Sequence, residues 1–364
     1  MEPALQHIVE RVRAAAASAT PLRIRGGGSK DFYGQSLVGE LLDMTPLAGV
    51  TSYEPSELVV TARAGTPLAA LEAELADQGQ CLPFEPPYFG VGATVGGMVA
   101  AGLNGPARAA VGALRDYVLG ATVLDGRGEV LTFGGQVMKN VAGYDVSRLM
   151  AGSLGTLGVI TEVSLKVLPV APREATLRFQ LGEAAALQQL NRWGAQPLPV
   201  NASCWVMDAG QPYLWVRLRG AVAAVETACS SMGGERLDPA TAAAGWAALR
   251  EQALPFFARQ GDECLWRLSV PDSAPPLDVG ECLIEWGGAQ RWLKAPAAQA
   301  TRLRAAAAAV GGHATLFIAD SEQPARAVAV FSPLKPPLDR IHRALKQQFD
   351  PAGIFNRGRM YAEF

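Results

Sequence analysis

The alternation of hydrophobic and polar residues divides the first half of the chain into short strands and helices. Runs rich in valine, isoleucine and leucine, bounded by glycine or proline, predict strands at 22–25, 58–63, 116–124 and 129–133. Helical spacing is found at 1–20, where Leu5, Ile8, Val9 and Val12 share one face, and at 67–78, 95–103 and 145–150. Strands interleaved with helices in this way are typical of an α+β domain.

The pattern changes near residue 170, where an alternating strand from Val159 to Val167 ends at Leu168-Pro169. Beyond it we expect the order strand, helix, strand, strand, helix of a ferredoxin-like unit, at 176–180, 183–193, 202–207, 213–219 and 221–232. A second such unit is suggested by helices at 241–258 and 297–310 and strands at 264–270, 282–286 and 313–318. A helix at 338–349 and a compact tail close the chain. We therefore predict domains at 1–170 and 171–335, with a segment 336–364 that returns to the first domain.

Charge and composition narrow the classes of function. The 32 Lys and Arg residues nearly balance the 34 Asp and Glu residues, so no basic field predicts a nucleic-acid partner. Charged residues interrupt the N-terminal apolar face, which predicts neither a signal peptide nor a membrane span and favours a cytoplasmic protein. The five cysteines and three histidines are widely separated, and no metal site is expected from them.

The first glycine cluster, Arg25-Gly26-Gly27-Gly28-Ser29-Lys30, directly follows a predicted strand. Glycines can take positive φ and turn successive amides toward one point, which suits a pyrophosphate. Arg25 and Lys30 would add positive charge, and Ser29 a hydroxyl donor. A bare glycine triplet is about as often a flexible turn, so this cluster alone decides nothing.

Two further glycine clusters lie in the same predicted domain. The stretch 90–97 precedes a helix of small residues, and the stretch 139–145 leads by a short helix to 152–160, which enters the last strand. Neither G-x-G-x-x-G nor G-x-x-x-x-G-K-[ST] occurs, which disfavours Rossmann and P-loop sites. Glycine-rich turns at several strand and helix junctions of one domain favour a long extended ligand.

Four motifs occur in one order: R-G-G-G-S-K, G-A-T-V-G-G, K-N-V-A-G-Y-D and G-S-L-G-T-L-G-V-I-T-E. This set resembles the FAD-binding domain of the vanillyl-alcohol oxidase and p-cresol methylhydroxylase (PCMH) superfamily. Across nearly the whole chain, further motifs such as W-G-G, G-H-A-T and F-N-R-G-R-M resemble the family of FAD-binding E subunits of bacterial glycolate oxidase. The resemblance implies a PCMH-type FAD-binding domain followed by a ferredoxin-like α+β cap domain.

The resemblance also implies an FAD site. The amides of 25–29 would hold the pyrophosphate, residues 94–97 and Gly102 would line the cleft, and residues 158–160 would approach the adenine. Gly143 and Tyr144 would lie near the isoalloxazine or its ribityl chain, and Asn356 and Arg359 would return from the tail, although a structural role is as strongly expected for Tyr144, Asn356 and Arg359. The implied cofactor-binding residues are Arg25, Gly26, Gly27, Gly28, Ser29, Lys30, Gly92, Thr94, Val95, Gly96, Gly97, Gly102, Gly143, Tyr144, Gly158, Val159, Ile160, Asn356 and Arg359.

FAD is expected to bind without a covalent bond, because no histidine lies between His7 and His313 and Cys81 has the setting of a core strand residue. Full-length hydroxy-acid dehydrogenases of the superfamily carry a histidine cluster in the C-terminal half, and commonly Glu where this chain has Leu154. This chain lacks both features, so no catalytic residue is assigned. Four arginines on or beside predicted strands could bind a carboxylate or form salt bridges, and none is chosen as an anchor: Arg217, Arg219, Arg267 and Arg291.

Three functional hypotheses follow from the resemblance and from the features in which this chain differs from the full-length dehydrogenases. In the first, the chain is an FAD subunit of glycolate oxidase that works with a catalytic D-type flavoprotein and an iron–sulfur F subunit, and any membrane contact comes through these partners. In the second, it is a stand-alone FAD-dependent 2-hydroxy-acid dehydrogenase. In the third, it is a scaffold that has lost its flavin.

Overall fold

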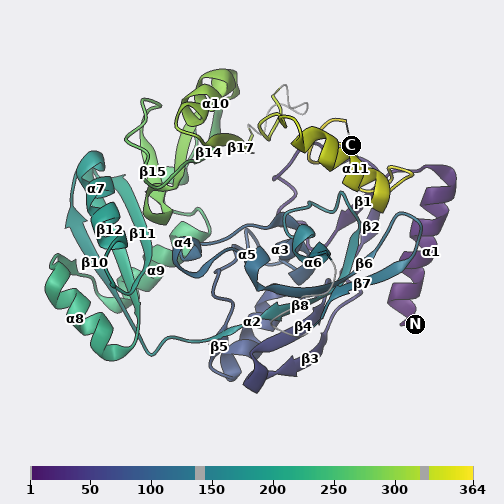
Figure 1. Ribbon diagram of the computed structural model, residues 1–364, viewed down its shortest axis with the longest axis horizontal. Helices are drawn as coiled ribbons and strands as arrows, with labels where there is room; N and C mark the ends of the chain where they lie inside the picture. Colours follow the sequence, from purple (N-terminus) through teal and green to yellow (C-terminus); the bar gives the residue numbers. More distant parts are fainter. Residues whose placement is uncertain (1, 136–143, 320–327, 364) are drawn as a thin grey trace.

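The computed structural model describes residues 2–135, 144–319 and 328–363, which form two large antiparallel sheets (Figure 1). The first sheet has the strand order β3-β4-β8-β6-β7 and comes from the N-terminal half of the chain. The second has the order β13-β10-β12-β11-β15-β16-β14-β17 and lies to one side of it, in teal and green. These elements confirm the predicted α+β class.

The five-stranded sheet consists of β3 (Val50–Glu54), β4 (Val59–Arg63), β6 (Val118–Leu124), β7 (Val130–Gly134) and β8 (Val159–Lys166). Helices α2 (Leu68–Asp77) and α3 (Val95–Ala101) bury their apolar faces against the central strands. The short helices α4 (Arg108–Val111), α5 (Leu114–Tyr117) and α6 (Val146–Leu149) connect the remaining elements, and β5 (Gln80–Cys81) pairs with β9 (Leu168–Pro169). Cys81 is a half-buried strand residue, as predicted.

A small parallel pair, β1 (Leu22–Arg25) and β2 (Glu40–Asp43), lies beside this sheet. Helix α1 (Pro3–Ser18) packs against it, and so does the C-terminal tail that follows α11 (Leu338–Phe349). The tail is held beside β1 by two backbone hydrogen bonds, from Leu22 N to Ile354 O at 2.7 Å and from Asn356 N to Leu22 O at 2.9 Å. The two ends of the chain therefore support the loop that follows β1.

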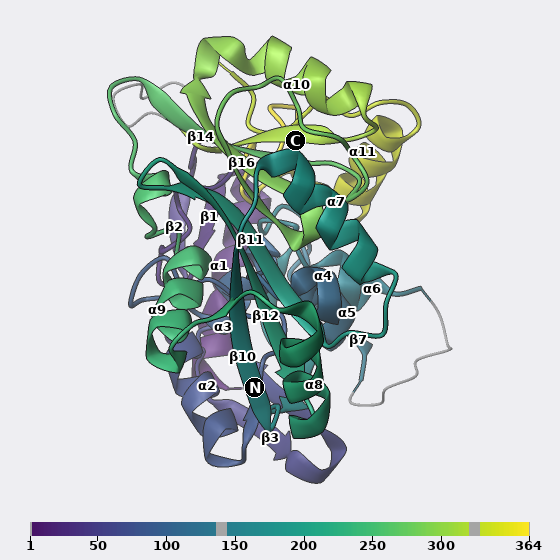
Figure 2. The same cartoon turned by 90° about the vertical axis from the view of Figure 1, so that its left-hand side faces the viewer.

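The eight-stranded sheet is built from two ferredoxin-like units (Figure 2). The first contains β10 (Arg173–Gln180), α7 (Glu183–Gly194), β11 (Val200–Asp208), β12 (Gln211–Gly220), α8 (Val222–Met232) and β13 (Glu235–Arg236). The second contains β14 (Glu263–Ser269), β15 (Cys282–Glu285), β16 (Gln290–Pro296), α10 (Ala300–Ala309) and β17 (His313–Ile318). The strand orders β13-β10-β12-β11 and β17-β14-β16-β15 are equivalent, and pairing of β11 with β15 joins the units. Segment 270–281 stands where the second unit would have its first helix.

Several predicted boundaries were wrong. The expected helix at 241–258 is α9 (Pro239–Arg250), capped by Asp238 and followed by a separate 3-10 turn at Pro255–Phe257, because a proline there cannot continue an α-helix. The expected strand from residue 116 starts only at Val118, after α5. Strands β2, β3 and β16 were not predicted; β16 carries Arg291 and Lys294, which obscure its strand pattern. No helix among the described residues is both long and apolar enough to span a membrane.

The junction between the two ferredoxin-like units buries an acidic side chain. Glu285, at the end of β15, is 4% exposed, and its Oε2 accepts hydrogen bonds from Gln290 Nε2 at 2.9 Å and Trp292 Nε1 at 2.6 Å. Burial raises the pKa of this carboxyl to about 7. The folded protein thus holds the proton more tightly than the unfolded chain, so Glu285 favours folding below its ordinary pKa and loses that contribution as the pH rises to about 7.

We expect Glu285→Gln to raise the free energy of unfolding at pH 8 by about 3 kcal/mol, because the pKa of Glu285 is raised from 4.5 to about 7 and a difference of one unit corresponds to about 1.4 kcal/mol. Glutamine keeps an oxygen for both donors and carries no charge. Urea unfolding at pH 5 and pH 8 measures the effect, which should be small at the lower pH. Glu281→Gln, at an exposed position just before β15, is the charge-matched control. An equal gain at both pH values would contradict this account.

Candidate cofactor-binding site

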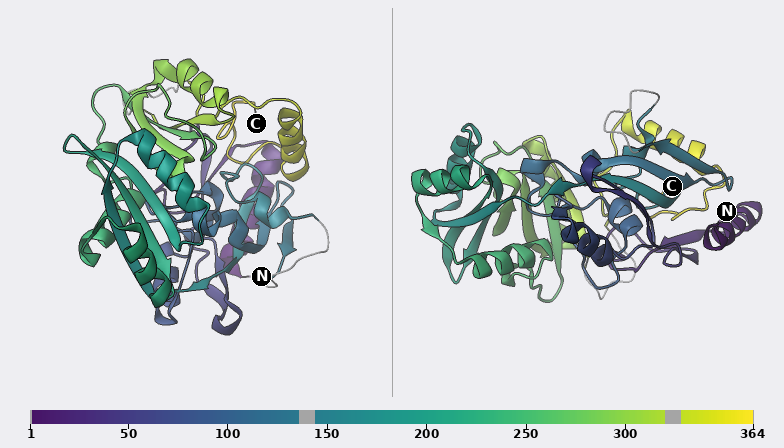
Figure 3. Two further views of the ribbon diagram at one scale, coloured as in Figure 1. Left: turned by 60° about the vertical axis from the view of Figure 1, so that its left-hand side comes forward. Right: turned by 90° about the horizontal axis from the view of Figure 1, so that it is seen from below.

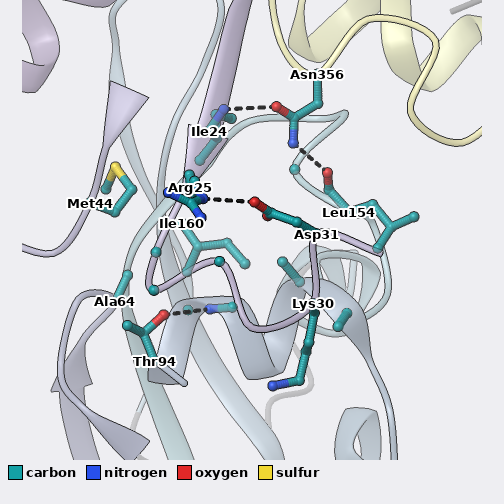
Figure 4. A pocket seen from close by; sticks show the side chains of 18 of the residues that line it. Ile24, Arg25, Lys30, Asp31, Met44, Ala64, Thr94, Leu154, Ile160 and Asn356 are labelled. Carbon is teal, nitrogen blue, oxygen red and sulfur yellow. Dashed lines mark hydrogen bonds and ion pairs between the residues drawn. The ribbon is translucent and has the colours of Figure 1, made fainter. Parts of the chain in front are cut away.

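A cavity lies where the loop after β1, the start of α3, the turn before β8 and the C-terminal tail meet (Figure 4). It encloses about 800 Å³ of empty space, part of it open to solvent. Thirteen of the predicted cofactor-binding residues line it: Arg25, Gly26, Gly27, Gly28, Ser29, Lys30, Thr94, Gly96, Gly97, Gly158, Ile160, Asn356 and Arg359. Segments far apart in the sequence therefore converge on one site.

The loop 26–29 presents unused hydrogen-bond donors to this cavity. Within the described parts of the chain, the backbone N–H groups of Gly26, Gly27, Gly28 and Ser29 donate to no protein acceptor. Arg25 Nε pairs with Asp31 Oδ2 at 2.8 Å and so closes the base of the loop. Consecutive free amides beside a cation suit the oxygens of a phosphate group.

Two glycines in this loop have conformations or contacts that a side chain would prevent. At Gly28, φ is +76°, and a Cβ there would lie 2.1 Å from Arg25 Nη2. At Gly27, a Cβ would lie 1.5 Å from the carbonyl oxygen of Gly92, in the second glycine cluster. The two clusters therefore touch through their backbones, which explains why both need glycine.

The C-terminal tail holds the loop from behind. Asn356 Oδ1 accepts from Ile24 N at 2.8 Å, and its Nδ2 donates to Leu154 O at 2.6 Å. Arg359 donates to the carbonyl oxygens of Gln35 and, at 2.8 Å, of Asp31. Both side chains line the cavity but use polar atoms to join the backbone segments that form it, so the structure gives them a positioning role.

The ammonium group of Lys30 points away from the free amides. Its Nζ donates to Tyr88 O at 3.1 Å and to Ser29 Oγ at 3.3 Å, and lies 6.0 Å from the centre of the Phe89 ring. Burial lowers the pKa of Lys30 to about 8, against the opposing effect of Glu251. Lys30 therefore joins the side chain of Ser29 to the neighbouring loop, while Arg25 is the cation at the base of the glycine loop.

Six predicted residues lie elsewhere or outside the described structure. Val95 and Val159 are fully buried in the cores around α3 and β8, and Gly92 and Gly102 shape the loops without lining the cavity. Tyr144 is 94% exposed, and Gly143 lies outside the described residues. The apolar lining was missed, because single core-type residues carry no cofactor signal in sequence: Leu37, Met44, Ala64, Ala100, Ala101 and Leu154.

The four arginines considered as carboxylate anchors have different surroundings. Arg217, 3% exposed, is paired with Glu85 at 2.7 Å, and Arg219 with Glu174 and Glu85. Arg291 is fully buried and donates to three backbone carbonyl groups. Only Arg267, of these four, lines a cavity without a carboxylate partner among the described residues.

The cavity meets the requirements of a dinucleotide. It has apolar surfaces at Met44, Ala64 and Ile160, and it has free amides beside Arg25 along its wall. No histidine or cysteine is among the described residues that line it, and no group of three or more possible metal ligands is found in the described chain. The two touching glycine loops form one wall of the cavity, and a Cβ on Gly27 would force them apart.

This fold and site define a flavoprotein with a PCMH-type FAD-binding domain. A family model described as FAD binding domain matches residues 4–134. The solved structure of an alkyldihydroxyacetonephosphate synthase aligns with a TM-score of 0.67 at 16% identity, covering 96% of this chain and 75% of that one, and shares the fold.

The chain belongs to the GlcE family of glycolate oxidase subunits. It is 48% identical over 359 residues to the glycolate oxidase subunit GlcE of Escherichia coli K12, covering 98% of this chain and 97% of that protein. A D-lactate dehydrogenase of Anaerostipes hadrus is 38% identical over 136 residues, which is 37% of this chain and 28% of that protein. The glycolate oxidase subunit GlcD of Bacillus subtilis is 31% identical over 128 residues, which is 35% of this chain and 27% of that protein. The predicted family and cofactor are thereby confirmed.

Proposed function

We propose that this chain is the FAD-carrying subunit of a glycolate-oxidising enzyme complex. The observation that carries the proposal is the row of free amides in the loop 26–29, in a chain that matches GlcE over nearly its full length. In this proposal the amides hold the FAD pyrophosphate without a covalent bond, and Met44, Ala64 and Ile160 provide an apolar surface for the adenine. Bound FAD would supply reversible acceptance of two electrons.

The proposed partners are a catalytic D-type flavoprotein and an iron–sulfur F subunit. The name of the E. coli relative, a subunit, supports an assembly. The shared region of about 128 residues with GlcD supports two related FAD domains in it. In this proposal the complex is cytoplasmic and reaches the membrane only through its partners, and this chain relays electrons or holds the assembly together.

The visible spectrum of the purified chain tests the proposal. We expect a flavin spectrum that leaves with acid precipitation of the protein and that does not bleach on anaerobic addition of glycolate. Colour that stays with the precipitate would contradict non-covalent binding. Bleaching by glycolate would instead support the stand-alone dehydrogenase, and absence of flavin after added FAD would support the scaffold.

Co-expression with the two partner subunits tests the assembly. We expect all three to be retained together on an affinity tag carried by this chain. Recovery of this chain without either of them would count against the complex.

A further inference from the structure

A second cavity, which we call the arginine pocket, is lined by residues of the FAD-binding part of the chain and of the eight-stranded sheet. These two parts of the chain lie side by side in Figure 3. The arginine pocket encloses about 640 Å³ of empty space open to solvent. Arg108 and Arg115 come from α4 and α5, and Arg267 and His313 from β14 and β17. Three arginines, two from short helices and one from a strand of the eight-stranded sheet, thus line one cavity.

The charge in the arginine pocket is not balanced by the residues that line it. No lining residue among those described is acidic. The side chain of Arg108 makes no hydrogen bond or ion pair with another described residue, and its guanidinium stacks over the Trp286 ring at 4.7 Å. Arg267 donates to the Tyr33 hydroxyl at 3.1 Å and lies over the Phe317 ring at 5.4 Å.

Two carboxylates lie near this pocket and both already have partners. Glu285 accepts from Gln290, a lining residue, and Trp292, and Asp116 is the other. It accepts from Ala113 N at 2.9 Å and lies 3.8 Å from Arg115. Burial and the charges of Arg267 and Arg115 lower the pKa of Arg108, while Asp116 opposes the shift. Half-buried guanidinium groups without a counter-ion are costly, and a bound anion relieves that cost.

The surrounding side chains hold the pocket in shape. Asn104 Nδ2 donates to Gly102 O at 3.0 Å, and its Oδ1 accepts from Leu114 N at 2.6 Å. Trp286 Nε1 donates to Gly105 O at 3.1 Å, which fixes the ring under Arg108. The donors on Arg108 are therefore oriented before any ligand binds, which lowers the entropic cost of binding.

The arginine pocket also adjoins the proposed FAD cavity. Ala101 lines the cavity and the next residue, Gly102, lines the pocket. Likewise Leu154 lines the cavity and Ala151, in the same glycine-rich turn, lines the pocket. The backbone at the end of α3 therefore contributes to both cavities.

We propose that Arg108 and Arg267 form a binding site for a small carboxylate in this chain itself, separate from any site in a partner subunit. The inference rests on the proposed function for the identity of the neighbouring cofactor. The class of ligand is a 2-hydroxy or 2-oxo acid, or a small dicarboxylate of similar size. Two guanidinium groups, one on α4 and one on β14, would each bind carboxylate oxygens, so ligand binding also ties the FAD-binding part of the chain to the eight-stranded sheet.

Calorimetric titration of the full-length chain with oxalate, which is not oxidised by the flavin, tests the site. We expect saturable binding in the wild type and at least a tenfold weaker affinity in Arg108→Gln and in Arg267→Gln, as is usual for loss of a charge-assisted hydrogen bond. Arg267→Lys should recover part of the loss, because it keeps the charge. Arg192→Gln, at an exposed position on α7, removes the same charge elsewhere and should bind oxalate within twofold of wild type.

FAD content and circular dichroism of each sample distinguish loss of the oxalate site from loss of FAD and from loss of the fold. A variant that keeps both and loses oxalate binding supports the site. Oxalate binding that is undetectable in a wild-type chain that carries FAD overturns the inference and leaves the proposed function intact. Binding that falls equally in Arg192→Gln, or that follows ionic strength alone, also overturns it. A chain without FAD contradicts the proposed function, and oxalate binding is then judged on the apoprotein.

Discussion

Replacing Gly27 with alanine is expected to remove FAD from the purified chain. A Cβ at this position would lie 1.5 Å from the carbonyl oxygen of Gly92, so the two glycine loops would have to separate. Separation moves the free amides of 26–29 away from the phosphate position, and hydrogen bonds to a charged group contribute about 1.5–3 kcal/mol each. We therefore expect at least about a 100-fold loss of FAD affinity.

The contact between the loops also supplies a graded comparison for this prediction. A Cβ at Gly92 would lie 3.0 Å from Gly27 O, a distance that a shift of a few tenths of an ångström relieves. Gly92→Ala should therefore reduce FAD affinity only modestly. Gly182→Ala, where a Cβ meets nothing within 4 Å, should leave it unchanged. Flavin absorbance after gel filtration, with circular dichroism as the folding check, measures all three. Full FAD content in Gly27→Ala would refute the role given to this loop.

The sequence was sufficient to predict the glycine loops but not the walls of the site. Positions 26–28 could be identified because the glycine triplet follows a predicted strand and is joined by two further glycine clusters in the same domain, although the triplet alone is equally consistent with a flexible turn. Arg108, Trp286 and Asn104 could not, since an arginine in a short helix and an asparagine in a turn have ordinary structural explanations. Their significance depends on which elements of the second sheet lie opposite them, and that pairing is a tertiary property.

The second domain illustrates the same limit. The first ferredoxin-like unit was predicted nearly residue by residue, because α7 and β11 have clean helical and strand patterns. In the second unit, β16 was not predicted. Its Arg291 is buried and donates hydrogen bonds to backbone carbonyl groups. In the sequence, a buried arginine that is hydrogen-bonded to nearby carbonyl groups cannot be told apart from an exposed one. A strand that contains such an arginine is therefore not predicted from the pattern of hydrophobic residues.

Replacing Lys346 with methionine is expected to lower the free energy of unfolding by about 4 kcal/mol, the usual cost of breaking a buried ion pair. Lys346 is 6% exposed and Asp350 is 1% exposed, and their Nζ and Oδ2 atoms lie 2.7 Å apart. Lys346 Nζ also donates to Thr156 O and Phe355 O. The variant removes the ammonium group from a buried carboxylate and from the two carbonyl groups that accept hydrogen bonds from it.

This pair connects the tail to the FAD site, so Lys346→Met should weaken FAD binding as well as folding. Asp350 accepts the backbone N–H groups of Ile354 and Phe355, and the next residue, Asn356, holds Ile24 and Leu154 at the cavity. Urea unfolding and flavin titration measure the two effects. Lys335→Met, at an exposed position before α11, is the control and should change neither. Because Lys346→Met/Asp350→Asn removes the unpaired charge, it should recover part of the stability. If it is no more stable than the single variant, lost packing rather than the buried charge accounts for the effect.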